Sequence, residues 1–258
     1  MEKTQEQIAI EKQRTRLTKF FHEACAGYRL IEEGDHILIG LSGGKDSLLL
    51  TELLGKRAQI YKPRFRVTAL HVRVKERDYH SDLSYLEDFC RQAGVPLVVR
   101  DIAIDERKDE INNQRAEAAN PCFLCAWYRR KTLFNVAQEL GCNKIAFGHH
   151  KDDVVQTMLM NLVFAGSFAT MPPMLQLEKM PLRIIRPLCL IPEADIIAYA
   201  QMRGYVKQSK LCPFEHESAR EKTKDLLAQM KALNPEALST LYNAMTNIKP
   251  EYLPKTKS

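Results

Sequence analysis

The sequence predicts an α/β fold, with a doubly wound, mainly parallel sheet of five strands and helical segments at both ends. Short strand-like runs alternate with helical patterns through most of the 258 residues, and this alternation is typical of parallel sheets. A glycine-rich loop also leads directly from the first of these runs into a helix, as phosphate sites do. The length is sufficient for one α/β domain and a helical appendage.

The expected elements begin with an amphipathic helix over about residues 5–29. The five strands are expected over residues 36–41, 66–72, 96–101, 144–148 and 183–188. Helices are expected at 83–93, 126–140, 152–164, 192–203, 218–233 and 235–245. The predicted domains are an N-terminal helix (1–30), a nucleotide-binding domain (31–206) and a C-terminal helical segment (207–258).

The glycine-rich loop reads Ser-Gly-Gly-Lys-Asp-Ser over residues 42–47. Glycines allow tight turning and close approach of an anion, and the amides and dipole of the following helix attract phosphate. A plain glycine turn needs neither the paired serines nor the aspartate at these spacings. The candidate phosphate-binding residues are therefore Ser42, Gly43, Gly44, Lys45, Asp46 and Ser47.

Two common nucleotide-binding patterns do not fit this loop. The kinase-type loop needs four residues between its glycine and its Gly-Lys pair, with Ser or Thr after the lysine. Here only three residues separate Gly40 from Gly44, and Asp46 follows Lys45. The dinucleotide-binding pattern fails as well, because no glycine lies two residues before Gly43.

Further polar residues lie where the predicted strands end. Ligands of doubly wound sheets bind at the carboxyl ends of the strands, so the sequence around residues 70–72, 148–153 and 186–187 is expected to contribute to the site. For the histidine pair at 149 and 150, ordinary core or surface histidines are the alternative. The additional candidates are Leu70, His71, Val72, Gly148, His149, Asp152 and Asp153.

The cysteines suggest a metal centre. Cys122 and Cys125 form a Cys-x-x-Cys pair just before a predicted helix, whose N-terminus favours thiolates. Cys212 lies in a predicted loop and suits a third ligand. Three cysteines with an open position fit a [4Fe-4S] cluster with one exchangeable iron, and they equally fit zinc completed by His216.

The whole chain has a net charge of +6, which is compatible with a polyanionic partner. Its seven cysteines form no extracellular framework, and residues 1–19 are charged and polar rather than a signal peptide, so a reducing, cytoplasmic setting is expected. The uncharged stretch 154–177 contains two prolines and polar residues, which argue against a membrane span.

The loop at 42–47 resembles the pyrophosphatase loop of the PP-loop ATPases, which cleave ATP to AMP and pyrophosphate. With the other motifs, the chain resembles the TtcA family, the tRNA 2-thiocytidine synthetases of that superfamily, whose fold is of the adenine nucleotide alpha hydrolase type. The resemblance covers roughly residues 10–250. The matching motifs are the loop, the Cys122/Cys125 pair with Arg129-Arg130, residues 148–153, Met171-Pro172-Pro173, Arg186-Pro187-Leu188, Cys212, and Ala244-Met245 with Asn247.

This resemblance implies a reaction and a set of roles. ATP adenylates the C2 oxygen of a cytidine at tRNA position 32, and sulfur delivered through a [4Fe-4S] cluster on Cys122, Cys125 and Cys212 replaces AMP. Asp46 would bind Mg2+, Lys45 and Ser47 the phosphates, and the backbone at 70–72 the adenine, while His149 and Asp152 would lie near the α-phosphate or the target base.

The implied partners are tRNA and a sulfur donor such as a cysteine desulfurase; a homodimer is possible, and no membrane is involved. Two other functions remain open from the sequence. One is another PP-loop tRNA-modifying enzyme, similar to a lysidine synthetase or a different thiolase, in which the cysteines hold a structural zinc. The other is a non-catalytic nucleotide or metal sensor, although the intact Asp46 and Ser47 argue against a decayed site.

Overall fold

The computed structural model describes residues 4–74, 82–103, 121–206 and 219–254. The chain divides into two compact units. Unit 1 comprises Met1–His150 with Pro172–His216, and unit 2 comprises Lys151–Met171 with Glu217–Ser258.

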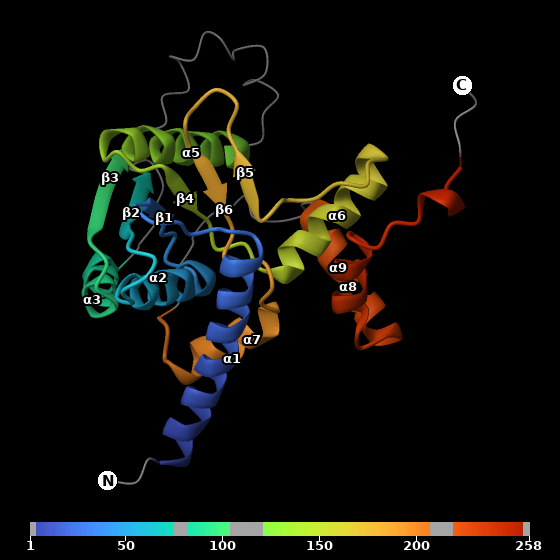
Figure 1. Cartoon of the computed structure of the whole chain (residues 1–258), viewed down its shortest axis with the longest axis horizontal. Coiled ribbons are helices and arrows are strands. Elements are labelled where there is room, and N and C mark those ends of the chain that lie inside the picture. The colour runs from blue at the N-terminus through green and yellow to red at the C-terminus, as the bar shows by residue number, and fades with distance from the viewer. Residues whose placement is uncertain (1–3, 75–81, 104–120, 207–218, 255–258) are drawn as a thin grey trace. The chain divides into compact units, whose positions relative to one another are not determined.

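Unit 1 is built on a six-stranded sheet in the described residues, with the order β3-β2-β1-β4-β6-β5 (Figure 1). The strands are β1 (His36–Gly40), β2 (Arg66–Val74), β3 (Leu97–Ile102), β4 (Lys144–Ala146), β5 (Met174–Gln176) and β6 (Arg183–Ile185). The parallel pairs are β1 with β2, β1 with β4, β2 with β3 and β4 with β6. The doubly wound, mainly parallel fold expected from the sequence is thereby confirmed.

The expected number of five strands is wrong by one. The additional strand, β5, pairs antiparallel with β6 through Met174 and Ile185, Leu175 and Ile184, and Gln176 and Arg183. Its three residues, Met174, Leu175 and Gln176, include no β-branched side chain and directly follow two prolines, a context that predicts a loop rather than a strand. Its position at the edge of the sheet is set by the turn that returns the chain to β6.

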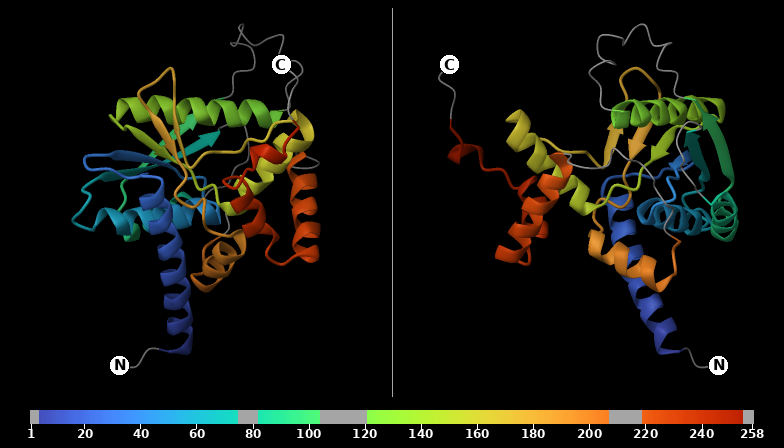
Figure 2. Two further views of the ribbon diagram at one scale, coloured as in Figure 1. Left: turned by 45° about the vertical axis from the view of Figure 1, so that its right-hand side comes forward. Right: turned by 180° about the vertical axis from the view of Figure 1, so that it is seen from behind.

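Helices cover both faces of this sheet. They are α1 (Gln5–Gly27), α2 (Lys45–Ala58), α3 (Leu83–Ala93), α5 (Pro121–Glu139) and α7 (Glu193–Met202). Figures 1 and 2 show α5 along one face and α2 with α3 along the other. Under α5, a core cluster joins Leu133 and Val136 to strand residues such as Leu38, Leu70 and Ile145. Burial of these side chains provides the main driving force for packing the layers together.

At the beginning of β4, the ammonium group of Lys144 is completely buried. Its Nζ donates to Asp35 Oδ2 at 2.7 Å, to Glu32 Oε2 at 2.9 Å and to the Leu30 carbonyl at 3.2 Å. The hydrogen bond from Lys144 and its charge hold the pKa of Glu32 below its usual value. A buried charge is tolerated when it is paired and hydrogen-bonded, so these contacts fasten the segment before β1 to β4.

Unit 2 is helical. It contains α6 (Lys151–Ala165), α8 (Ala219–Leu233), α9 (Ala237–Ala244) and the 3-10 turn η1 (Pro250–Tyr252) (Figure 2). Its core is formed by Val155, Met158, Leu159, Leu227 and Leu238. None of the helices in the described part of the chain is both long enough and apolar enough to cross a membrane.

Replacing Lys144 by Met should lower the free energy of unfolding by about 3–5 kcal/mol, because the Asp35 carboxylate would remain buried without its cation. Chemical denaturation followed by circular dichroism measures this loss. The double variant Lys144→Met/Asp35→Asn removes both charges and should recover part of it. A loss of less than about 1 kcal/mol in the single variant would be typical of a surface ion pair instead.

Candidate active site

The phosphate loop connects β1 to α2 and has an ordered internal geometry. Gly43 has a positive φ of 79°, a conformation that glycine adopts without the steric cost borne by other residues. The Gly44 amide donates to Ser42 Oγ at 3.3 Å, and Ser47 Oγ donates to the Gly44 carbonyl at 2.9 Å. The two serine hydroxyls lie 3.2 Å apart. The structure therefore brings the two serines together around the N-terminus of α2, where backbone amides and the helix dipole favour an anion.

Four charged or titratable side chains meet beside this loop. Lys45 Nζ lies 3.2 Å from Asp46 Oδ2 and 3.0 Å from Oε1 of Glu193, the first residue of α7. His150 is buried, and its Nε2 lies 4.0 Å from Asp46 Oδ1 and 3.9 Å from Glu193 Oε1. The sequence predicted Lys45 and Asp46 as site residues and placed His150 in the segment 148–153 that was expected to contribute to the site, but it did not predict Glu193.

The Lys45 ammonium is stabilised by its two acidic neighbours. Burial by itself lowers the pKa of Lys45, but the charges and hydrogen bonds of Asp46 and Glu193 outweigh burial and raise the pKa above its usual value. Lys45 is therefore a cation at neutral pH, available to a phosphate oxygen.

Gly148 brings the segment after β4 into direct contact with the start of α2. A Cβ atom at this position would lie 3.0 Å from the Asp46 carbonyl carbon, 3.1 Å from its oxygen and 3.2 Å from the Ser47 amide nitrogen. These distances are shorter than ordinary van der Waals contacts. Close packing against α2 therefore requires glycine at this position. The absence of a side chain also lets the following residues, including His150, approach Asp46.

The predicted adenine-reading segment, residues 70–72, lies inside β2 rather than beyond it. The pairing of β1 with β2 ends at Gly40 and Leu70, and the Leu41 amide then donates to the Leu70 carbonyl at 2.9 Å. β2 continues to Val74 and is paired with β3 on its other edge. Its edge toward β1 therefore extends past the phosphate loop, where parallel sheets bind nucleotides.

His71 is a buried structural residue of this region. Its Nδ1 lies 2.8 Å from the Leu41 carbonyl, which can only accept, so Nδ1 carries the proton. Burial lowers the pKa of His71 despite this hydrogen bond. A neutral imidazole consequently fixes Leu41, the residue just before the phosphate loop.

Asp152 and Asp153 lie in the first turn of α6, within unit 2. Asp152 Oδ1 accepts from Lys231 Nζ at 2.5 Å, and Asp153 pairs with Arg220. Both carboxylates are buried, and both bind cations of α8. The structure thus gives them a role in fastening α6 to α8, while their role in cofactor binding remains a prediction.

The two proline motifs lie next to each other in unit 1. The Arg186 amide donates to the Pro173 carbonyl at 2.8 Å, and its Nη1 donates to the Pro172 carbonyl at 2.6 Å. Burial lowers the pKa of this guanidinium. Arg186 thus holds the chain that precedes β5 against the end of β6.

The Cys-x-x-Cys pair lies within α5, not before it as the sequence suggested, because the helix begins at Pro121. Proline suits the first helical position, where its missing N–H has no partner to lose. Positions 122 and 125 are one helical turn apart, and Cys125 is half-buried. Cys212 and His216 lie outside the described residues.

The structure describes four other cysteines, all as reduced thiols: Cys25, Cys90, Cys142 and Cys189. Burial raises the pKa of Cys90 to about 12 and that of Cys142 to about 11. Burial and the neighbouring Cys189 raise the pKa of Cys25 to about 12. Metals bind the thiolate, so Cys25, Cys90 and Cys142 are poor ligands. Within the described ranges, no three His, Cys, Asp or Glu side chains are grouped to hold a metal.

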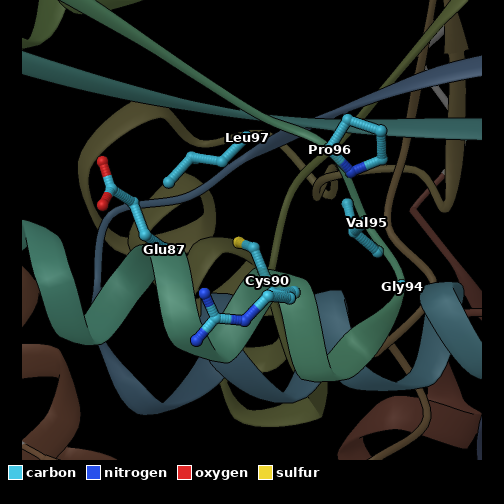
Figure 3. Close-up of a pocket in the computed structure, with 7 residues that line it drawn as sticks. Glu87, Cys90, Gly94, Val95, Pro96 and Leu97 are labelled. Carbon is cyan, nitrogen blue, oxygen red and sulfur yellow. The ribbon is translucent and has the colours of Figure 1, made fainter.

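A shallow pocket lies between α3 and the start of β3 (Figure 3). It has a volume of about 400 Å³ and is lined by Glu87, Cys90, Arg91, Gly94, Val95, Pro96 and Leu97. None of these residues belongs to the predicted site. The pocket is therefore separate from the phosphate loop.

Comparison with known proteins agrees with this geometry. The PP-loop domain family matches residues 10–208. The chain is 31% identical to the tRNA-cytidine(32) 2-sulfurtransferase of Chromohalobacter salexigens, covering 96% of this chain and 86% of that protein. It is 33% identical to the protein of the same name from Geotalea uraniireducens, covering 93% of this chain and 94% of that protein.

A solved structure is also similar over most of the chain. It is the U34-tRNA thiolase NcsA from Methanococcus maripaludis with its [4Fe-4S] cluster. The sequence identity is 25% and the TM-score is 0.72, and the match covers 95% of this chain and 81% of that chain.

Replacing Gly148 by Ala should weaken ATP binding by about tenfold or more, because the added methyl group must displace the first turn of α2 by a few tenths of an ångström. Isothermal titration calorimetry with ATP measures this change. Gly27→Ala is the matched control, since a Cβ there meets nothing within 4 Å. Equal ATP affinities for the two variants would contradict a tight contact at Gly148.

Proposed function

We propose a reaction for this chain from one premise: it belongs to the TtcA family, the PP-loop tRNA-cytidine(32) 2-sulfurtransferases. The reaction is ATP-dependent replacement of the C2 oxygen of a tRNA cytidine, at position 32, by sulfur. The use of ATP is supported by the loop with its two serines at the N-terminus of α2, beside Lys45 and Asp46. The tRNA substrate and the transfer of sulfur are inferred from membership of the family.

The phosphate loop supports cleavage of ATP between the α and β phosphates. Backbone amides of the loop and the Ser42 and Ser47 hydroxyls are donors for the pyrophosphate oxygens. The Lys45 ammonium compensates the negative charge that develops on the leaving group. The base oxygen is a poor leaving group until it carries AMP, so adenylation precedes the entry of sulfur.

The site also fits a magnesium ion. Asp46 Oδ1 is buried and has no hydrogen-bond partner among the described residues, whereas Oδ2 accepts from Lys45. Mg2+ is commonly held by one or two carboxylates together with substrate phosphates. Asp46 is therefore the residue that would hold it, and the ion would neutralise phosphate charge.

The cysteines fit a [4Fe-4S] cluster on Cys122, Cys125 and Cys212. Two of these positions are one turn apart at the N-terminus of α5, where the helix dipole favours thiolates. Cys25, Cys90 and Cys142 are less suited to metal binding, because burial raises their pKa values and favours the protonated thiol. A cluster with three protein ligands would supply sulfur at its fourth iron.

The remaining residues prepare the substrate. The β2 edge at 70–72 is available for the adenine, and Gly148 contacts the start of α2. We propose that His149 lies near the α-phosphate or the target base. We further propose that tRNA binds through phosphate contacts and that the target base leaves its stack. A cysteine desulfurase supplies sulfur to a cytoplasmic enzyme, which acts as a monomer or a homodimer.

ATP should be converted to AMP and pyrophosphate when tRNA is present, and Asp46→Asn should abolish this conversion because it removes the metal-binding charge. Thin-layer chromatography of labelled nucleotides identifies the products. Asp88→Asn is the control, since that carboxylate lies on the surface of α3 and pairs with Arg91. ADP and orthophosphate as products would refute the PP-loop reaction.

Replacing Cys122, Cys125 or Cys212 by Ala should each stop 2-thiocytidine formation and leave tRNA binding unchanged, because the cysteines deliver sulfur and do not hold the RNA. Nucleoside mass spectrometry and filter binding measure the two quantities, and Cys142→Ala is the control. Anaerobic wild-type protein should contain iron and sulfide. Colourless protein with stoichiometric zinc that His216→Ala releases would favour a structural zinc.

A further inference from the structure

We propose that Glu193 is a positioning residue that acts through Lys45: it shares the lysine ammonium with Asp46 and so keeps the Asp46 carboxylate accessible to a divalent cation. This role rests on the proposed function to the extent that ATP with a divalent cation is the ligand of the phosphate loop. Glu193 lies 148 positions from Lys45 in the sequence.

The distances indicate a shared ammonium. Lys45 Nζ is 3.0 Å from Glu193 Oε1 and 3.2 Å from Asp46 Oδ2, so neither carboxylate holds it exclusively. The second oxygen of Asp46, Oδ1, is buried without a hydrogen-bond partner among the described residues. His150 Nε2 faces this oxygen at 4.0 Å, which is beyond hydrogen-bonding distance.

The charge balance explains why sharing matters. Lys45 carries one positive charge, and the two carboxylates that it contacts, Asp46 and Glu193, carry two negative charges, so one ammonium serves two carboxylates. If Glu193 lost its charge, Asp46 would be the one charged carboxylate of the two that contact Lys45. The Lys45 ammonium would then neutralise the Asp46 charge. A divalent cation would then have to compete with an ammonium only a few ångströms away, and like charges at that distance repel.

Glu193 is held in place by a second contact between the same two helices. The buried Glu52 carboxylate of α2 accepts from the Tyr199 hydroxyl of α7 at 2.8 Å and from the Tyr205 hydroxyl at 2.7 Å. These hydrogen bonds fix α7 against α2. The first residue of α7 therefore reaches Lys45 without a mobile connection between them.

The experiment measures ATP affinity by isothermal titration calorimetry over a series of MgCl2 concentrations, with anaerobically prepared protein and no tRNA. Glu193→Gln should raise the Mg2+ concentration at half-maximal ATP affinity by about three- to fivefold, the size expected for redistributing a partly exposed ion pair. Glu193→Asp keeps the charge and should bring the midpoint back toward the wild-type value.

Asp195→Asn is the matched control. Asp195 also lies in the first turn of α7, but it bonds with Gln13 and Arg16 of α1. This variant should keep the wild-type Mg2+ midpoint. An unchanged or lowered midpoint in Glu193→Gln, or ATP binding by the wild type that does not depend on Mg2+, would overturn the assignment. A wild-type protein that binds ATP with Mg2+ but does not thiolate tRNA would refute the proposed function and leave the Glu193 assignment standing.

Discussion

The parallel pairing of β1 with β2 on one edge and with β4 on the other determines where the phosphate loop, the β2 edge and the segment after β4 lie. The connections that leave β1 and β4 start at the same end of the sheet, where ligands of parallel sheets bind. The Lys144 ion cluster secures this pairing from the opposite end, since it ties residues before β1 to the first residue of β4. The register between the two strands is thus fixed by a charge that is buried and fully paired.

Charged groups are fully hydrogen-bonded at one end of these strands, whereas a carboxylate oxygen at the other end has no partner among the described residues. At the amino ends, Lys144 is surrounded by acceptors and contributes to stability. At the carboxyl ends, Asp46 has a buried oxygen without a partner among the described residues, and its neighbour Lys45 is shared between two carboxylates. An unsatisfied buried oxygen costs free energy in the protein alone. A bound cation would recover that cost, so the same fold is stable at one end and ready for a ligand at the other.

The sequence predicted what local patterns encode and missed what distant contacts create. The phosphate loop, the parallel strands and the helices follow from spacing and hydrophobic period, and each was expected within a few residues of its position. The strand β5 was missed because its three residues include no β-branched side chain and follow two prolines, whereas the equally short β4 and β6 contain isoleucine. Glu193 was missed as a site residue because its contact with Lys45 arises only when the start of α7 packs against α2. His150 lay in a segment expected to contribute, but its position beside Asp46 and Glu193 could not be read from the sequence.

The packing of α7 against α2 is what converts a generic nucleotide loop into a site with two carboxylates. Glu52 lies on α2, two turns after Lys45. Burial raises the pKa of its carboxyl group, but hydrogen bonds from Lys56, Tyr205 and Tyr199 together with the Lys56 charge outweigh burial and lower the pKa below its usual value. Burial and the negative charge of Glu52 in turn raise the pKa of both tyrosines, so their hydroxyls remain donors. The Glu52 carboxylate accepts hydrogen bonds from the two protonated tyrosine hydroxyls, and these bonds hold α7 against α2. The first residue of α7, Glu193, therefore lies beside Lys45.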